Sequence, residues 1–286
     1  MFAAKRGCNS FTPPIAVILD FLTELYHKGL SYSSINTARS ALSTYISVDG
    51  QPMGSHPLIR RFMRGVFQLR PALPRYTVSW DTTVVLKFIK KLSPVRVLNL
   101  KRLTFKLVML IALLTGQRCQ TIHALTVSGT TVTDNYVKFR IKSLLKQSRP
   151  NYHLHELQIK GYAPDRRMCI ISVLKEYLKR TVALRPPDSD NLLISYVKPF
   201  KAVSRDTISR WVKTILGLSG VDTSIFSAHS TRAASTTDAK GMHVPLSTIM
   251  RTAGWSTTST FSKYYDKTGT KSKDFAESLQ NRANRH

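Results

Sequence analysis

Two short stretches near the end of the chain hold residues that could act on a phosphate group. The stretch HSTR places His229 and Arg232 three residues apart. On a helix this spacing puts both side chains on one face, so they can reach one phosphate together. Further along, an isolated Trp255 precedes two adjacent tyrosines, Tyr264 and Tyr265. These side chains offer an imidazole for proton transfer, a guanidinium for an anion, an indole N–H donor and a phenol that could act as a nucleophile.

The composition favours a polyanionic partner. The chain has 286 residues with 43 Lys+Arg against 16 Asp+Glu, a formal charge of +27. Such a surplus destabilises a compact protein through self-repulsion unless a partner neutralises it. Nucleic acid fits this role best, because phosphate contacts release counterions. The basic residues are spread through periodic segments, which indicates a folded basic surface and not a basic arm.

The residue types also exclude several kinds of nucleic-acid chemistry. Two-metal nucleases need converging carboxylates, but acidic residues are few here and show no such spacing. The chain has no GxxxxGK[ST] phosphate loop, and His153 and His155 lack further zinc ligands at a usable spacing. We therefore expect no metal, no cofactor and no small-molecule substrate. Metal-free phosphoryl transfer with a protein nucleophile remains.

That reaction has definite requirements. Two guanidiniums should grip the non-bridging oxygens, where negative charge builds in the transition state. A hydroxyl must attack the phosphorus in line, and a general acid must protonate the departing oxygen. A phenol, with a pKa near 10, can leave again, so the broken strand can be rejoined. In chain order the sequence supplies this set as Arg118, His229, Arg232, Trp255 and a tyrosine at position 264 or 265.

The first third of the chain is expected to be helical. Thr12 and Pro13 can begin a helix that lasts until Gly29, and Ser33 or Ser34 can open the next. A third helix is predicted over 56–71, where four arginines lie off its apolar stripe. These candidate DNA-binding residues are Arg60, Arg61, Arg64 and Arg70. They form either a solvated basic face or a face that contacts phosphates.

The remaining chain is predicted to form a larger, mainly helical domain with a small sheet. Two prolines in 71–80 indicate a linker. Ser79 is expected to cap the next helix, and a long helix should run from Asn99 to Gly116. A strand is predicted over 131–141, a turn and strand over 144–162, and helices over 167–180 and 204–218. The predicted domains are a helical DNA-binding domain at 1–74, a linker at 75–78 and a catalytic domain at 79–286.

Two further features bear on location. No apolar run reaches about 18 residues, the length that spans a membrane. Cys8, Cys119 and Cys169 are far apart and show no disulfide or zinc spacing, which indicates a reducing, intracellular compartment.

Four motifs in order resemble the tyrosine recombinases, which include the Cre-like and Xer-type integrases. They are TGQRCQTIHAL at 115–125, HSTR at 229–232, AGW at 253–255 and TFSKYYDK at 260–267. The amino-acid sequences of these motifs are most similar to those of the recombinases of eukaryotic mobile elements, the DIRS-like retroelements and Cryptons. The stretch YSSINTARSALSTYI at 32–46 resembles the helical core-binding domain of that family. The resemblance implies a mainly α, two-domain clamp on double-stranded DNA, a homotetramer on two DNA sites and, for a eukaryotic element, the nucleus.

The resemblance also implies a role for each matching residue. Arg118 and Arg232 would be the two phosphate-gripping arginines, and His229 would donate to the phosphate or transfer a proton. Trp255 stands where many relatives carry a second histidine and would support the site through its indole N–H. The family places a lysine acid on a β-hairpin after the first arginine. Lys146 is the favoured candidate for it, and Lys142 is the alternative.

The nucleophile is one of two tyrosines, because adjacent helical residues diverge by about 100° and cannot both face one phosphate. Spacing from Trp255 as in Cre-like relatives selects Tyr264. The pattern of the mobile-element relatives, with an aromatic residue before the nucleophile, selects Tyr265, which we favour. Thr121 departs from the family pattern, since many bacterial relatives carry an acidic residue there. Gln120 and His123 are then the candidates to orient Arg118.

Other interpretations stay open on the sequence. A catalytically silent derivative would keep the DNA-binding fold without turnover, and an enzyme similar to topoisomerase IB would nick and rejoin DNA as a monomer. An RNA-binding structural protein would explain the charge alone. The helical segment before the linker is short for a core-binding domain, which is consistent with the loss of a first helix.

Overall fold

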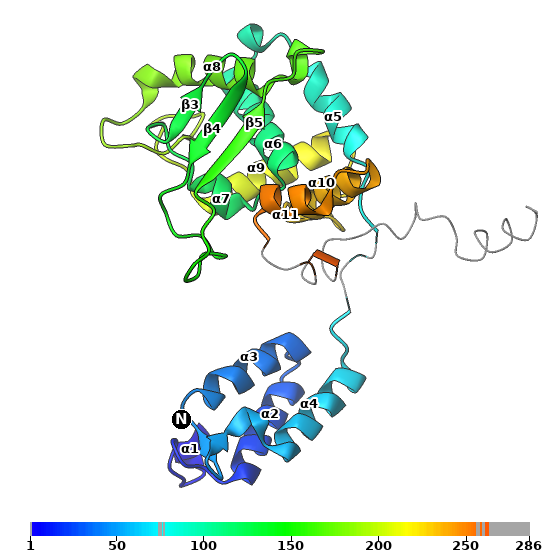
Figure 1. The fold of residues 1–286 in the computed structure, drawn as a ribbon. Helices are drawn as coiled ribbons and strands as arrows, with labels where there is room; N and C mark the ends of the chain where they lie inside the picture. Colours follow the sequence, from blue (N-terminus) through cyan, green and yellow to red (C-terminus); the bar gives the residue numbers. More distant parts are fainter. Residues whose placement is uncertain (1, 74–75, 77, 256–257, 259–260, 263–286) are drawn as a thin grey trace, which may run out of the picture. The chain divides into compact units, whose positions relative to one another are not determined.

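The chain divides into two compact units, residues 1–75 and 76–286. The structure is a computed structural model that describes residues 2–73, 76, 78–255, 258 and 261–262. Figure 1 shows the two units, which differ in their secondary structure. The first is helical with one two-residue hairpin, and the second combines helices with a three-stranded sheet. This agrees with the prediction of a mainly α protein with a small β-sheet.

The first unit packs its helices around one apolar cluster. Its elements are α1 (Phe2–Lys5), α2 (Ile15–His27), α3 (Tyr32–Ser43), β1 (Ser47–Val48), β2 (Gln51–Pro52), η1 (Met53–Ser55) and α4 (Pro57–Leu69). Leu22, Ile35 and Ile59 come from three different helices and are fully buried in this cluster. The predicted helix starts need correction, because Pro14 and Ser31 precede α2 and α3. The Ser31 hydroxyl accepts from the backbone N–H of Ser34, so the true cap lies before the serines predicted for it.

The second unit is built around α6, whose residues are almost all buried. Its helices are α5 (Thr82–Lys91), η2 (Val95–Val97), α6 (Leu100–Thr115), α7 (Cys119–His123), η3 (Arg166–Met168), α8 (Ile170–Thr181), η4 (Val182–Leu184), α9 (Arg205–Leu218), α10 (Ser230–Gly241) and α11 (Leu246–Ala253). Asn99 caps α6 and Gly116 ends it in a left-handed conformation, as predicted. The helix before it begins two residues later than predicted, because Asp81 and not Ser79 caps α5.

One antiparallel sheet completes this unit, with the order β3-β4-β5. The strands are β3 (Thr130–Val132), β4 (Tyr136–Arg140) and β5 (Glu156–Lys160). The segment 131–141 was predicted as one strand, but Thr133 bonds back to Tyr136 and turns the chain into a hairpin. Val137 and Phe139 are buried, alternate with less buried neighbours and face the core. The segment between β4 and β5 carries Lys146.

A buried lysine joins α6 to the end of α5. Lys106 is fully buried, and its ammonium donates to the carbonyls of Ile89 and Leu92 and to the hydroxyl of Ser93. Burial lowers the pKa of Lys106 to about 8. Its three donors thus bond to two carbonyls and a hydroxyl at the C-terminal end of α5, which holds α5 against the central helix.

Within the described ranges, no helix combines the length and the apolar character that crossing a bilayer requires.

Candidate active site

The turn that follows α6 positions the first candidate arginine. Gly116 closes α6 with a φ of 59°, and Arg118 then occupies the N-cap position of α7. The carbonyl of Gly116 accepts a hydrogen bond of 2.7 Å from Nη1 of Arg232. A Cβ added to Gly116 would lie 3.0 Å from Cγ2 of Thr236 and 3.7 Å from Cβ of Ala253. Glycine therefore allows α6, α10 and α11 to meet closely where the two arginines come together.

Helix α10 carries His229 and Arg232 at its start, and polar contacts fix it along its length. Figure 1 shows α10 beside α11 and close to α6. The contacts run from Nε1 of Trp80 to Oγ of Ser230 at 2.9 Å, from the Thr82 hydroxyl to Asp238 at 2.6 Å and from the Ser235 hydroxyl to the Leu113 carbonyl at 2.5 Å. The helix is thus held on both α5 and α6, which fixes the direction of its first turn.

These elements surround a cavity of about 270 Å³ that we call the cationic cavity. Among its lining residues the ionisable side chains are Arg118, Cys119, Lys146, Arg205, Asp206, His229 and Arg232. Asp206 forms an ion pair of 3.3 Å with its neighbour Arg205, so it offsets only part of the positive charge. The cavity therefore combines two of the predicted arginines with the predicted histidine and the favoured lysine. A site of this charge suits a phosphate group.

Arg232 is the most enclosed of the cations, with 1% of its surface exposed. Its guanidinium lies over the ring of Trp255, with Cζ 4.1 Å from the ring centroid. Trp255 is itself buried and packs on Phe261, with ring centroids 5.3 Å apart. Stacking on an indole holds a guanidinium in plane while its edge can still face an anion. The tryptophan thus acts on the site through the arginine.

His229 responds to the charges around it. Partial desolvation and then the positive charges of Arg118, Arg232 and Lys146 lower the pKa of the imidazole. His229 still contacts solvent. Binding of an anion in the cavity would offset the charges of the three cations and so weaken their effect on the pKa of His229. The three cations and His229 all line the cationic cavity, which accounts for their shared effect on the ring. Around neutral pH the ring is therefore mainly uncharged and can accept a proton.

The two candidate lysines lie in different surroundings. Lys146 lines the cationic cavity and its charge acts on His229. Lys142 lies near Asp190 instead. The hydrogen bond from the Ser128 hydroxyl lowers the pKa of the Asp190 carboxyl, and the charge of Lys142 adds to that effect. This arrangement favours Lys146 over Lys142 as the residue that would meet a phosphate in the cavity.

Arg118 is oriented by a residue that the sequence did not single out. Its Nη1 donates to Oε1 of Gln147 at 2.6 Å. Gln120, one of the two candidates for this role, instead accepts from the backbone N–H of Lys146 at 3.2 Å. Gln147 follows Lys146 directly, so its position beside the candidate acid was the signal in the sequence. Arg205 was also missed: it lies in the helix predicted over 204–218, is the first residue of α9 and lines the cationic cavity.

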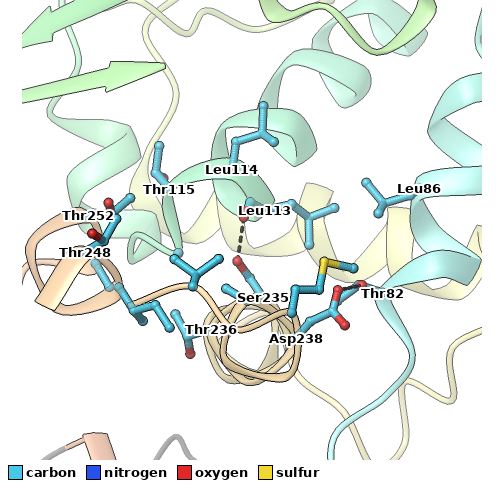
Figure 2. A pocket seen from close by; sticks show the side chains of 16 residues that line it. Thr82, Leu86, Leu113, Leu114, Thr115, Ser235, Thr236, Asp238, Thr248 and Thr252 are labelled. Atoms are coloured by element: carbon cyan, nitrogen blue, oxygen red, sulfur yellow. Dashed lines mark hydrogen bonds between the residues drawn. The ribbon is translucent and has the colours of Figure 1, made fainter. Parts of the chain in front are cut away.

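A second cavity, of about 360 Å³, lies at the other end of α10. Figure 2 shows its lining of leucine and threonine side chains, with the Ser235 hydroxyl pointing to the Leu113 carbonyl. Leu113, Thr236 and Ile249 bring α6, α10 and α11 to this wall. The first turn of α10 thus faces the cationic cavity, while its C-terminal half faces an apolar one. We place the candidate chemistry in the cationic cavity because phosphate requires charge.

The four candidate DNA-binding arginines, three on α4 and Arg70 at its C-cap, fall into two groups. Arg60, Arg61 and Arg64 are exposed. Arg70 is half-buried, donates to the carbonyls of Tyr26 and Leu30, and lies 4.2 Å from the ring centroid of Tyr26. Its guanidinium therefore joins the end of α4 to the end of α2 and the turn after it. The other three arginines remain available to a phosphate.

The predicted nucleophiles, Tyr264 and Tyr265, lie outside the described residues. Phe261, which the structure does describe, is buried and packs on Trp255. Among the residues that the structure does describe, no group of three or more His, Cys, Asp or Glu side chains could hold a metal ion.

Comparison with protein families gives one match that covers most of the chain. Residues 85–271 match the model of the phage integrase family. The match includes Arg118, Lys146, His229, Arg232 and Trp255, and it also spans both tyrosines. A comparison with curated proteins finds no significant match.

Several solved structures share the fold at low sequence identity. The XerH recombinase in a post-cleavage complex with a palindromic difH substrate is 17% identical, with a TM-score of 0.61, over 96% of this chain and 72% of that one. The integrase of transposon Tn1549 with transposon right end DNA is 14% identical, with a TM-score of 0.61, over 95% and 84%. A lambda integrase dimer on a COC′ core site is 17% identical, with a TM-score of 0.52, over 91% and 82%.

Proposed function

The chain belongs to the phage integrase family of tyrosine recombinases, and from that premise we propose that it cleaves and rejoins DNA strands through a 3′-phosphotyrosyl intermediate. The observation that carries this proposal is the meeting of Arg118, Lys146, His229 and Arg232 at one cationic cavity. These four residues come from three segments that are spread over more than a hundred positions of the chain. Their convergence supports a site built for one phosphate.

In this proposal the two arginines grip the non-bridging oxygens of the scissile phosphate. Their forked donors match the phosphate geometry and neutralise charge that grows as the nucleophile attacks. Arg232 is fixed by the Gly116 carbonyl and by Trp255, which makes it the rigid member of the pair. Arg118 bonds to a loop side chain, Gln147, through Nη1 alone, so other N–H donors of its guanidinium can reach the phosphate while that contact remains.

Two residues carry the proton transfers: His229 accepts one proton and Lys146 donates one. The tyrosine hydroxyl gives its proton to the neutral imidazole of His229 and forms a bond to phosphorus. The bond from phosphorus to the 5′ oxygen breaks, and that oxygen takes a proton from the ammonium of Lys146. The products are a 3′-phosphotyrosyl bond and a free 5′ hydroxyl. Rejoining is the reverse of these steps with the same or another 5′ hydroxyl.

The proposed nucleophile is Tyr265, with Tyr264 as the alternative. The proposed partner is double-stranded DNA, which the exposed arginines of α4 and the cationic cavity would contact through phosphates. A homotetramer on two DNA sites is part of the proposal. The lambda integrase has been solved as a dimer on a core site and as a tetramer on a Holliday junction, which supports that assembly by fold alone.

A nicked suicide DNA substrate tests the proposal. The nick lets a short fragment diffuse away after cleavage, so a covalent protein–DNA complex accumulates. We expect this complex to form in EDTA, to disappear in Tyr265→Phe and to persist in Tyr264→Phe. The opposite pattern would assign attack to Tyr264. If the complex persists in both variants, neither tyrosine alone is the required nucleophile. If no complex forms in the parent protein, the chain is a DNA-binding protein without this activity.

A further inference from the structure

The segment between β4 and β5 presents Lys146 to the cationic cavity, and its own side chains give it a defined shape. Leu145 is buried, and its backbone N–H donates to Oγ of Ser148 at 2.9 Å. The same hydroxyl lies 2.7 Å from Nδ1 of His153, whose Nε2 lies 3.1 Å from the carbonyl of Ile141. Because a carbonyl can only accept, Nε2 carries the ring proton, and Nδ1 accepts from the serine. Hydrogen bonds through Ser148 and His153 therefore hold the two ends of this segment together.

Two glutamines join the tip of this segment to α7. Gln120 on α7 accepts from the backbone N–H of Lys146 at 3.2 Å. In return, Gln147 reaches from the segment to Arg118, the N-cap residue of α7, at 2.6 Å. The two contacts run in opposite directions and enclose Lys146 between them. We call this pair of contacts the glutamine clasp.

The clasp also touches the far side of the site. A Cβ added to Gly254 would lie 2.6 Å from Nε2 of Gln147. Gly254 has a φ of 70° and immediately precedes Trp255, on which Arg232 stacks. The amide of Gln147 therefore lies between Arg118 and the turn at Gly254, which leads to Trp255.

We propose that the glutamine clasp positions Lys146 as the acid for the leaving 5′ oxygen, an inference that rests on the proposed function. Lys146 is exposed and has a long flexible side chain, so its ammonium samples many positions unless its backbone is fixed. A general acid acts only within hydrogen-bond reach of the atom that it protonates. Gln120 fixes the backbone from which the Lys146 side chain extends. Gln120 is thus a positioning residue that acts through Lys146, and Gln147 is one that acts through both Lys146 and Arg118.

A substrate with sulfur in place of the bridging 5′ oxygen separates this role from a general loss of structure. A thiol has a pKa near 8.5, so the sulfur can leave as an anion without a proton. With the natural suicide substrate we expect Lys146→Ala to slow covalent-complex formation by about 10²-fold or more. Gln120→Ala should slow it by about tenfold, because the acid remains but is less well placed. With the sulfur substrate both variants should approach the wild-type rate.

Gln147→Ala should recover only in part, because the sulfur substrate replaces the need for Lys146 but not the contact with Arg118. Gln158→Ala is the matched control, since Gln158 is an exposed glutamine on β5. It should match the wild type on both substrates. If Gln120→Ala is equally slow on both substrates, or unaffected on the natural one, the positioning role is wrong.

Hydrogen exchange of the protein without DNA tests the clasp independently of activity. The backbone amide of Lys146 should exchange faster in Gln120→Ala than in the wild type, and at the wild-type rate in Gln158→Ala. Unaltered exchange in Gln120→Ala overturns the clasp itself. If the wild type forms no covalent complex with either substrate, the proposed function fails and the positioning role falls with it, even where exchange shows that the clasp exists.

Discussion

The two arginines of the cationic cavity are held in different ways, although the sequence suggests equal roles. Arg232 is 1% exposed, stacks on Trp255 and donates to a backbone carbonyl. Arg118 is half-buried and bonds to the side chain of Gln147. One arginine is therefore part of the folded core and the other is a surface group at its edge. Replacing Arg118 should therefore lower activity alone, whereas replacing Arg232 should lower both activity and stability.

Arg118→Gln should lower covalent-complex formation by about 10² to 10³-fold, the effect of removing one donor to transition-state charge. Its urea unfolding midpoint should stay close to that of the wild type. Arg232→Gln should lose a similar share of activity and also about 2 kcal/mol of unfolding free energy, because the buried carbonyl of Gly116 loses its donor. Parallel kinetics and urea titrations measure both effects. Equal stability losses in the two variants would contradict this assignment.

The pKa of His229 gives the site a pH dependence with a definite sign. Desolvation and the charges of Arg118, Arg232 and Lys146 lower it below 6.5 in the folded protein. As pH falls through 6.5, the unfolded chain binds a proton that the folded protein does not, so stability decreases. His229→Gln lacks this effect and should gain stability relative to the wild type between pH 7 and pH 5.5. Urea titrations across this range measure the difference.

Salt provides the control for this trend, because the three cations act partly through solvent. In about 1 M salt, where screening acts within about 3 Å, the difference between His229→Gln and the wild type should become smaller. A difference that grows as pH rises, or that salt leaves unchanged, would contradict the charge-based account.

At the scale of elements, the site depends on close approach between helix ends. Gly116 ends α6 where α10 and α11 pass, and a Cβ there would come within 3.0 Å of Thr236. The carbonyl of the same residue holds Arg232. The end of one helix therefore sets the position of a side chain on another.

Gly116→Ala should lose about 1 kcal/mol of unfolding free energy from its left-handed conformation, and more from the contact with Thr236. It should also slow DNA cleavage, because the acceptor of Arg232 moves. Gly220→Ala is the matched control, since Gly220 has a φ of 92° and open space around its Cβ position. It should lose stability without losing activity. A comparable loss of activity in Gly220→Ala would contradict the specific role of Gly116.

The sequence was informative about most of these elements. Asn99 and Gly116 marked both ends of α6, and the apolar periodicity located α8 and α9 to within a few residues. Prediction from the sequence failed where a contact with a residue outside the element decides where a helix or strand begins or ends. Trp80 was predicted inside a helix but its indole donates to Ser230, so α5 starts after it with Asp81 as the cap. The turn at Thr133 was hidden because β-branched residues continue through it.

The candidate site was predictable in its residue types but not in its supports. HxxR spacing and the turn after α6 are local features, so His229, Arg232 and Arg118 could be selected from the sequence. The contact of Gln147 with Arg118 joins residues 29 positions apart, and the stack of Arg232 on Trp255 joins α10 to the residue that follows the end of α11. Such pairs have no fixed spacing, because folding and not periodicity brings them together.

At the scale of the whole molecule, the charge of +27 should govern DNA affinity. The three exposed arginines of α4 offer phosphate contacts, while Arg70 is engaged within its own unit. Replacing Arg61 and Arg64 by Gln should weaken binding to all DNA sequences. The same change should reduce the slope of log affinity against log salt by about one for each phosphate that the variant no longer neutralises.

Fluorescence anisotropy from low to moderate salt measures this slope. Arg70→Gln provides the comparison, because it should reduce the stability of the first unit more than the salt slope. A slope unchanged in the double variant would show that α4 does not contact phosphates.

The central claim is that Arg118 and Arg232 neutralise charge on a scissile phosphate in the cationic cavity. A suicide substrate with a neutral methylphosphonate at the scissile position tests it most directly, because it removes the charge that the arginines serve. We predict that the deficit of Arg118→Gln, about 10²-fold or more on the natural phosphate, shrinks to about tenfold or less on the neutral substrate. An equal deficit on both substrates would contradict the claim.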